Sequence, residues 1–547
     1  MAAALWMAVP DLHAIEDVPE GGLRWLQGYD GNAPTGGFRV DGRLRIEAPD
    51  EPQPVGLVLE SGRLEIGPGG ELLVQHGPGG SRFLQGDVVN DGLVSLNSVL
   101  LFSRDGAEWV NRGTIRAAMF MGLGVTGKGA RFRQASGEIH SDEPGSRLEF
   151  YNQSWFIHGG GKVFGSPAIV ASSARIEAAV TEDLRLRFLG PGCRLEGRYP
   201  ADLSVVVASD DVFGPVDLTL DPEGAIAGTL EVTASAQDPG AVVRCPGSGA
   251  TLAAEGVFRI LPGAGVSEIR GPLTIRGLLS VEGSMRWGAS DGGLTNRGRL
   301  LVSDEGRLQL SAPLVQASGT LEIGGGSLDA PSGVTVTGGT VVAAGRLSGP
   351  ITNSAIAVVD QARPARVTGR WVQTASATMR TVARFGPGSS GHALQVAGSL
   401  DLGGTLEVVS AGGSHLADGV ELRLLQADAV RGWFARLALP PLETGLHWQV
   451  VPSEREVRLV VRRSPAPLVI EWLHRDGGDL LRVSGPWGSQ QEVVLRVSPD
   501  LKQWTPFQRL FPFAGVATVP VPRNPGGEDG PMTVYQAVLG PVGSTTW

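Results

Sequence analysis

Residues 277–281 read GLLSV, and this phrase of a glycine followed by alternating apolar and polar residues returns three times downstream. It reads GRLLV at 298–302, GTLEI at 319–323 and GTVVA at 339–343, so that its glycines lie 21, 21 and 20 residues apart. Apolar residues at every second position are typical of a half-buried β-strand. A period of about 20 residues indicates a chain that winds into a solenoid of stacked coils.

The same phrase occurs earlier in the chain at less regular intervals, beginning at Gly42, Gly62, Gly92, Gly113 and Gly137. A second, weaker strand phrase follows many of the first ones, so each coil contains at least two short strands. Glycine suits the corners between them because it adopts positive φ without strain. We therefore predict an all-β chain, a right-handed parallel β-helix with about 20–21 residues per coil.

Asparagines mark several of the expected corners, namely Asn90, Asn111, Asn296 and Asn353. The first two lie 21 residues apart, which is one coil. An amide side chain at a corner bonds readily to the turn backbone, and stacked amides bond to one another. We interpret these asparagines as structural. From about 167 to 256 the phrase is less regular, and we expect a bulge, an insertion or a change of coil cross-section there.

Residues 371–463 resemble the closing segment of bacterial autotransporter-type β-strand repeat proteins, which are secreted β-helical passengers. The matching pieces are Gln373 and Thr374, Leu394 to Gly398, Leu402 to Val408, Leu424 to Ala427, and Gly432 to Phe434 with Pro440. The resemblance covers roughly residues 30 to 463. It implies a β-helical architecture and an exported protein, and its motifs are structural ones.

Beyond Pro465 and Pro467 several strand candidates recur at the spacing of an antiparallel β-sandwich. This part resembles a small C-terminal module of verrucomicrobial and planctomycete-type exported proteins, although Gln536 stands where that module has an arginine. The expected domain organisation has four parts: a signal remnant or disordered start (1–14), the β-helix (15–410), its C-terminal cap (411–463) and the sandwich module (464–547).

Charge and composition argue against some classes of binding partner. The formal net charge is −10 with both signs interspersed, which argues against nucleic acid and against an anionic membrane surface. No apolar run is long enough for a membrane-spanning helix, so we expect no integral membrane segment. Cys193 and Cys245 lie about two and a half coils apart, so we expect free, mostly buried thiols. We expect a monomer located outside the cell or on its surface.

A search for chemistry yields only weak candidates. Asp210 and Asp211 are the best carboxylate pair, but adjacent residues on a strand point to opposite faces, and no accompanying motif of a pectin-cleaving enzyme is present. Trp472, Trp487 and Trp504 are candidates for stacking on sugars, with a role in the sandwich core as the alternative. Histidines and cysteines have no metal-ligand spacing, so we expect neither a metal nor another cofactor.

These observations favour a non-enzymatic, exported surface or matrix protein with an adhesin-like or structural role. Its partner is expected to be a surface glycan or a protein. Two alternatives stay open: a polysaccharide-active β-helix enzyme, either a lyase or a glycoside hydrolase, and a glycan-binding module carried on a β-helical spacer. Carboxylates gathered on one face of adjacent coils would favour the enzyme.

Overall fold

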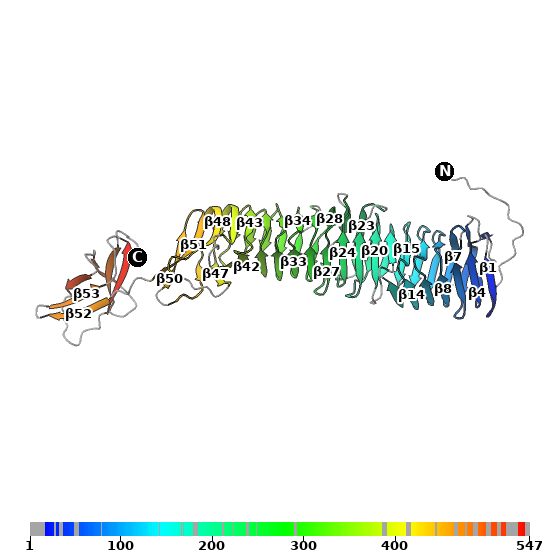
Figure 1. Cartoon of the computed structure of the whole chain (residues 1–547), viewed down its shortest axis with the longest axis horizontal. Coiled ribbons are helices and arrows are strands. Elements are labelled where there is room, and N and C mark those ends of the chain that lie inside the picture. The colour runs from blue at the N-terminus through cyan, green and yellow to red at the C-terminus, as the bar shows by residue number, and fades with distance from the viewer. Residues whose placement is uncertain are drawn as a thin grey trace. The chain divides into compact units, whose positions relative to one another are not determined.

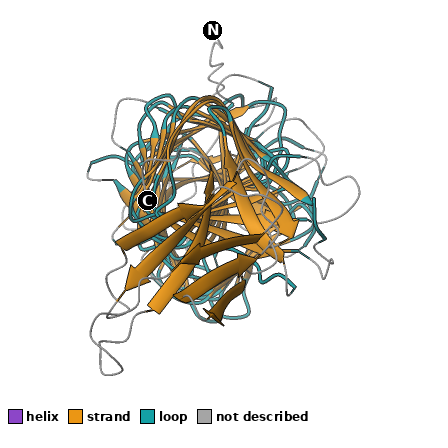
Figure 2. Cartoon of the chain, turned by 90° about the vertical axis from the view of Figure 1, so that its left-hand side faces the viewer, coloured by secondary structure: helices purple, strands orange, loops and turns teal. Residues whose placement is uncertain are grey.

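The structure is a computed structural model in which every described regular element is a β-strand (Figures 1 and 2). It describes residues 17–541 except 27–28, 32–36, 49–53, 78, 142, 166, 168, 179–183, 210–212, 223, 237–239, 248, 289–292, 385–390, 412–416, 444–445, 464–468, 476–477, 485–490, 499–504, 511–515 and 521–533. Residues 1–14, Pro465 and Pro467 therefore lie outside the described part. Two compact units are present, the first formed by 1–413, 423–440 and 452–458, the second by 414–422, 441–451 and 459–547.

The first unit is a parallel β-solenoid whose coils follow one another from β1 to β49 (Figure 1). Each strand pairs with its counterparts in the coils before and after it, so the strands form ladders. We call the longest one ladder A. Its strands are β2 (Tyr29–Gly31), β5 (Val55–Ile66), β7 (Arg82–Asn90), β9 (Leu100–Phe102), β12 (Gly122–Val125), β15 (Arg147–Phe150), β18 (Ile169–Ser172), β20 (Arg185–Leu189), β22 (Ser204–Ala208), β24 (Thr229–Thr233), β27 (Val257–Ile260), β30 (Leu278–Val281), β33 (Arg299–Val302), β36 (Thr320–Ile323), β39 (Thr340–Ala343), β42 (Ile356–Asp360), β45 (Thr378–Ala383), β47 (Thr405–Ser410) and β49 (Arg436–Ala438).

Ladder B follows ladder A in each coil, and the long strands β5 and β7 contribute to both. Its other strands are β3 (Phe38–Val40), β10 (Glu108–Asn111), β13 (Arg131–Gln134), β16 (Trp155–His158), β19 (Arg175–Ala178), β21 (Cys193–Gly197), β23 (Val216–Pro222), β25 (Ala241–Arg244), β28 (Val266–Arg270), β31 (Ser284–Trp287), β34 (Arg307–Leu310), β37 (Ser327–Asp329), β40 (Arg346–Ser348), β43 (Ala365–Thr368), β46 (Leu394–Leu402) and β48 (Glu421–Gly432).

A third ladder completes the coil, but only in two separate stretches. Ladder C, in the first stretch, consists of β1 (Leu23–Leu26), β4 (Arg43–Glu47), β6 (Glu71–Gln75), β8 (Leu93–Leu96), β11 (Thr114–Ala117), β14 (Glu138–Ser141) and β17 (Lys162–Gly165). Ladder D, in the second, consists of β26 (Ala250–Leu252), β29 (Leu273–Ile275), β32 (Leu294–Asn296), β35 (Leu314–Gln316), β38 (Val334–Val336), β41 (Ile351–Asn353) and β44 (Trp371–Gln373).

No third strand occurs among the described residues between β17 and β26, which confirms the expected change of cross-section. Here the fully described connection from ladder B back to ladder A, residues 198–203, has six residues. The corresponding connection between β10 and β12 is residues 112–121, ten residues including β11. Six residues leave no room for a strand with a corner at each end.

The register confirms the predicted coil length. Leu279, Leu300, Leu321 and Val341 are successive partners in ladder A, and all four side chains are buried. Their neighbours along each strand face outward, as the alternation of a β-strand requires. Residues one coil apart in sequence therefore become vertical neighbours, and stacked apolar side chains form a continuous core.

The corner asparagines are also confirmed as structural. Asn90 donates from Nδ2 to Oδ1 of Asn111 at 2.7 Å, and Asn111 donates to Oε1 of Gln134 at 2.7 Å. In the second half, Asn296 donates to Gln316 at 2.6 Å and Asn353 to Gln373 at 2.9 Å. The Oδ1 atom of Asn90 also accepts from the backbone N–H of Gly92 at 3.2 Å. These amides thus form hydrogen bonds both within the corner and to the neighbouring coil.

The second unit contains two antiparallel three-stranded sheets, as expected for a sandwich-type module. One sheet comprises β52 (Val469–Arg475), β53 (Gly478–Ser484) and β56 (Val516–Pro520); the other comprises β54 (Gln491–Ser498), β55 (Thr505–Leu510) and β57 (Val534–Pro541). Leu481, Val483, Val494 and Leu495 are buried. Between the solenoid ladders and these sheets the chain forms β50 (Leu446–Pro452) and β51 (Glu456–Arg463).

Candidate functional site

The candidates taken from the sequence do not converge on one described site. Asp210 and Asp211 lie outside the described residues, and so do Trp487 and Trp504. Trp472 lies in β52, where its backbone pairs with that of Leu481 in β53. The proposed roles of these five residues stay predictions, and the geometry of a site has to be sought elsewhere on the chain.

Charged side chains on the outside of the solenoid pair across coils. Arg259 in β27 lies between Glu231 of the preceding coil, at 3.0 Å, and Glu282 of the following coil, at 3.1 Å. Hydrogen bonding to Glu282 raises the pKa of the Arg259 guanidinium above its ordinary value. Arg244 pairs in the same way with Asp217 at 2.8 Å, and this bond raises the pKa of Arg244. Several outward carboxylates thus have an arginine from a neighbouring coil as their partner.

This arrangement bears on the choice between an enzyme and a scaffold. Hydrolysis of a glycosidic bond needs a carboxyl group that holds a proton near neutral pH, beside a second carboxylate. The carboxylates described above are instead bonded to arginines of neighbouring coils. Within the described residues, moreover, no group of three His, Cys, Asp or Glu side chains could hold a metal ion.

A hollow of about 800 Å³ runs along the corner between ladders A and B. Corner glycines line it, among them Gly306, at which a Cβ atom would lie 2.1 Å from the carbonyl oxygen of Val281. Glu282 and Asp304 line it before the corner, and Arg307 beyond it. We call this hollow the corner groove. Its glycines are needed for the close approach of the coils, and their lack of side chains keeps the groove open.

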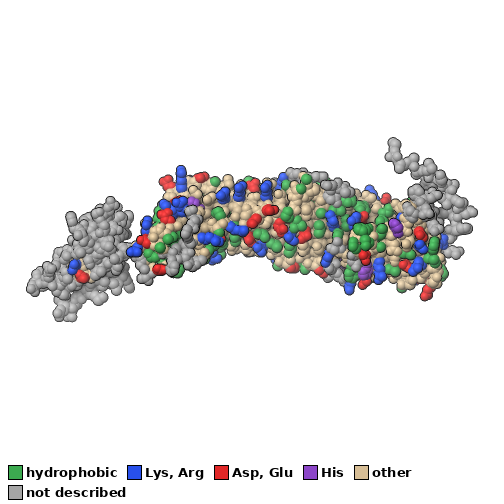
Figure 3. All heavy atoms as spheres, viewed as in Figure 1, with side chains coloured by type: hydrophobic (Ala, Val, Ile, Leu, Met, Phe, Trp, Pro, Cys, Tyr) green, Lys and Arg blue, Asp and Glu red, His purple; other side chains and the backbone are tan. Residues whose placement is uncertain are grey.

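A row of basic side chains borders the corner groove and extends past it. Arg307, Ser327, Arg346 and Arg366 are successive partners in ladder B, and the three arginines are exposed. None of these arginines forms an ion pair with a described residue, unlike Arg259. Figure 3 shows basic side chains over the strands labelled β34 and β43 in Figure 1. This row is a candidate site for an anionic partner.

Sequence reasoning missed the basic row because the row depends on register. Its arginines are 39 and 20 residues apart, which separates them by two coils and by one. The sequence contains a partial indication of the row, because Arg307 and Arg346 both directly follow a corner glycine, in GRLQL and GRLSG. The ladder was needed to show that Arg366, which follows an alanine, belongs to the same row.

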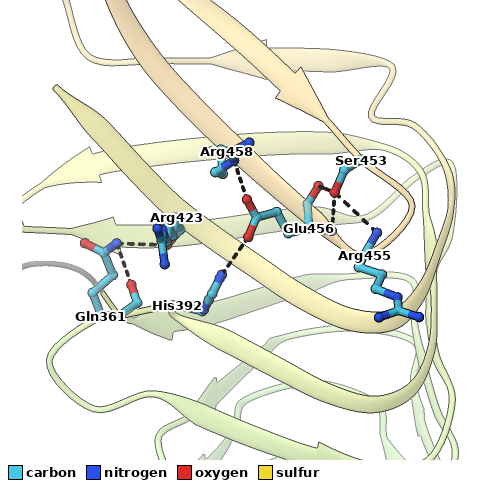
Figure 4. Close-up of polar contacts among 8 residues, drawn as sticks. Gln361, His392, Arg423, Ser453, Arg455, Glu456 and Arg458 are labelled. Carbon is cyan, nitrogen blue, oxygen red and sulfur yellow. Dashed lines mark hydrogen bonds and ion pairs between the residues drawn. The ribbon is translucent and has the colours of Figure 1, made fainter. Parts of the chain in front are cut away.

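Polar contacts between distant segments also occur near the end of the solenoid (Figure 4). His392 is 8% exposed, and its Nε2 atom lies 3.5 Å from a carboxylate oxygen of Glu456, whose other oxygen pairs with Arg458. Gln361 donates to the backbone oxygens of Gly391 at 3.1 Å and Arg423 at 3.0 Å. Because these contacts join segments far apart in sequence, we interpret them as holding the last coils together.

Comparison with known protein families gave no match, and comparison with curated proteins gave none either. The described part of the chain contains no helix that could cross a membrane.

Proposed function

We propose that this protein is an exported, non-enzymatic scaffold of the cell surface or extracellular matrix, with an adhesin-like or structural role. The observation that carries the proposal is the cross-coil pairing of outward carboxylates with arginines, as at Glu231, Arg259 and Glu282. Such pairing links neighbouring coils along a long repetitive surface, and the paired carboxylates already have arginine partners. The resemblance of residues 371–463 to autotransporter-type passengers supports the exported location.

Adhesion by such a surface would depend on repetition. Coils stack at about 4.8 Å, so groups in one ladder are presented at regular short intervals. Weak contacts to a polymer of similar repeat then add up, because each later contact is made at a high effective concentration. The basic row at Arg307, Arg346 and Arg366 would supply such contacts to an anionic surface glycan or protein. Binding of this kind falls as salt increases.

A panel of immobilised polysaccharides tests this proposal, with both retention of the protein and release of reducing ends measured. We expect retention without release. Release that disappears in an Asp210→Asn variant would overturn the proposal and favour the polysaccharide-active enzyme. Retention that is lost when Trp472, Trp487 and Trp504 are replaced together, with the circular dichroism of the solenoid unchanged, would favour the glycan-binding module on a spacer.

A further inference from the structure

A second hollow lies on the outer face of ladder A, at a strand with two outward-facing glycines. In β12, Leu123 and Val125 are buried in the core, so alternation directs Gly122 and Gly124 outward. Gly124 is flanked in the ladder by Leu101 and Glu149. Both glycines line a hollow of about 290 Å³. No residue with a side chain fits at position 122, because a Cβ atom on Gly122 would lie 1.9 Å from the backbone oxygen of Arg147.

An exposed aromatic ring lines this hollow. Phe120 is 68% exposed and has a φ of 60°, a conformation that costs a residue with a bulky side chain about 1–2 kcal/mol. Its ring lies against Gly145, at which a Cβ atom would be 2.4 Å from Cδ1 of the ring. The backbone N–H of Phe120 donates to the oxygen of Pro144 at 2.9 Å. A strained backbone and an obligatory glycine together hold this ring at the surface.

The hollow continues into a neighbouring one of about 210 Å³, and Gly145 and Arg147 line both. Val170 in β18 and Arg187 in β20 line the second hollow. We call the two hollows together the ladder A trough. Figure 3 shows hydrophobic side chains gathered in this part of the solenoid, near the strands labelled β15 and β20 in Figure 1.

The trough also offers fixed polar groups beside its apolar surface. Arg147 pairs with Glu149, and the hydroxyl of Tyr151 donates to the same carboxylate at 2.7 Å. A sugar ring has a matching character, with an apolar C–H face that packs on an aromatic ring and a rim of hydroxyl groups that donate and accept hydrogen bonds. A run of sugar rings would reach both hollows, because the trough follows successive strands of one ladder.

We propose that the ladder A trough binds a linear glycan, with one sugar ring on Phe120 and its hydroxyl groups on Arg147 and Glu149. A sugar polymer fits better than an apolar peptide segment, because the charged side chains of Arg147 and Glu149 line the hollow beside Phe120 and need hydrogen-bonding partners. This inference rests on the proposed function and specifies its partner as a glycan.

Calorimetric titration with cellohexaose, chitohexaose and hexagalacturonate tests the inference. We expect at least one of these to bind the full chain, and a Phe120→Gly variant to bind it at least tenfold more weakly. The same variant should have an unchanged or higher unfolding temperature, because glycine relieves the strain at positive φ. A Gly124→Val variant should also lose binding, since its side chain occupies part of the hollow; a Cβ atom there would lie 3.0 Å from the flexible end of Leu101.

Met119→Ala is the matched control, because Met119 is 51% exposed in the same turn and does not line the trough. Its affinity should stay within twofold of the unaltered protein. The inference is overturned if no hexasaccharide binds, if the control loses as much affinity as Phe120→Gly, or if both trough variants bind normally. Release of reducing ends would instead contradict the non-enzymatic function, so the two failures are distinguishable.

Discussion

Single residues hold neighbouring coils together through buried polar contacts. Asn111 is fully buried, donates to Gln134 and accepts from Asn90, so it links three coils. Burial of an amide is favourable only when its hydrogen bonds are made. The row of amides therefore fixes the vertical register of the coils in addition to satisfying the corner.

Replacing Asn111 by alanine should lower the free energy of unfolding by about 2 kcal/mol or more, because Asn90 and Gln134 each lose a buried partner. Urea unfolding measures the effect, and hydrogen exchange in β10 and β13 locates it. Asn97→Ala is the control, because Asn97 is exposed, and it should cost no more than about 0.5 kcal/mol. Equal effects of the two substitutions would contradict the role of the amide row.

The two cysteines are free and buried, as predicted. Burial raises the pKa of the Cys245 thiol from 9.0 to about 12. Between these values the unfolded chain loses this proton and the folded chain keeps it, so the stability of the fold should decrease as pH rises from about 9 towards 12. A Cys245→Val variant should show a shallower decrease in its unfolding temperature over this range. An identical decrease in both proteins would exclude Cys245 as a cause.

At the scale of the element, the glycine phrase specifies a corner and the strand after it, but not the ladder to which the strand belongs. The phrase at Gly113 leads into β11 of ladder C, whereas the phrase at Gly298 leads into β33 of ladder A. Both glycines are needed for the same local reason, which is the close approach of a backbone oxygen one coil away. The stretch without a third strand lies between them along the chain.

Substitutions at two glycines can distinguish the cost of a close contact between coils from the cost of a positive φ angle. Gly319 has a φ of 68° and Gly106 one of 69°, yet a Cβ at Gly319 would lie 2.0 Å from the oxygen of Gly298, and one at Gly106 would meet nothing within 4 Å. Gly106→Ala should cost about 1–2 kcal/mol from backbone strain alone. Gly319→Ala should cost about 3 kcal/mol or more. Equal losses in urea unfolding would show that coil contact is unimportant at the corner.

At the scale of the whole molecule, the first unit is a quasi-one-dimensional stack in which each coil contacts mainly its neighbours. Its ladders are not uniform, because the described coils between β17 and β26 have two strands where the others have three. Fewer backbone hydrogen bonds then join one coil to the next. The stack should therefore be weakest in this stretch.

Hydrogen exchange should detect this weakness. Amides of β20, β22 and β24 should exchange about tenfold faster or more than those of β30, β33 and β36, which belong to the same ladder A in coils with three strands. A difference of about 1.4 kcal/mol in local opening corresponds to that factor. Uniform protection along ladder A would mean that the solenoid opens as one cooperative unit.

The sequence by itself determined the all-β class, the coil length, the structural asparagines and the unpaired cysteines, because each follows from local alternation, from corner chemistry or from counting along the chain. It did not determine to which ladder a strand belongs, and it did not reveal the basic row or the ladder A trough. Those features depend on the register between coils. Stacking alone brings together the basic row of Arg307, Arg346 and Arg366, and it also places Phe120 against Gly145. Two residues become vertical neighbours on the solenoid only if the strands and connections between them add up to one full coil. A short sequence pattern does not determine this total length.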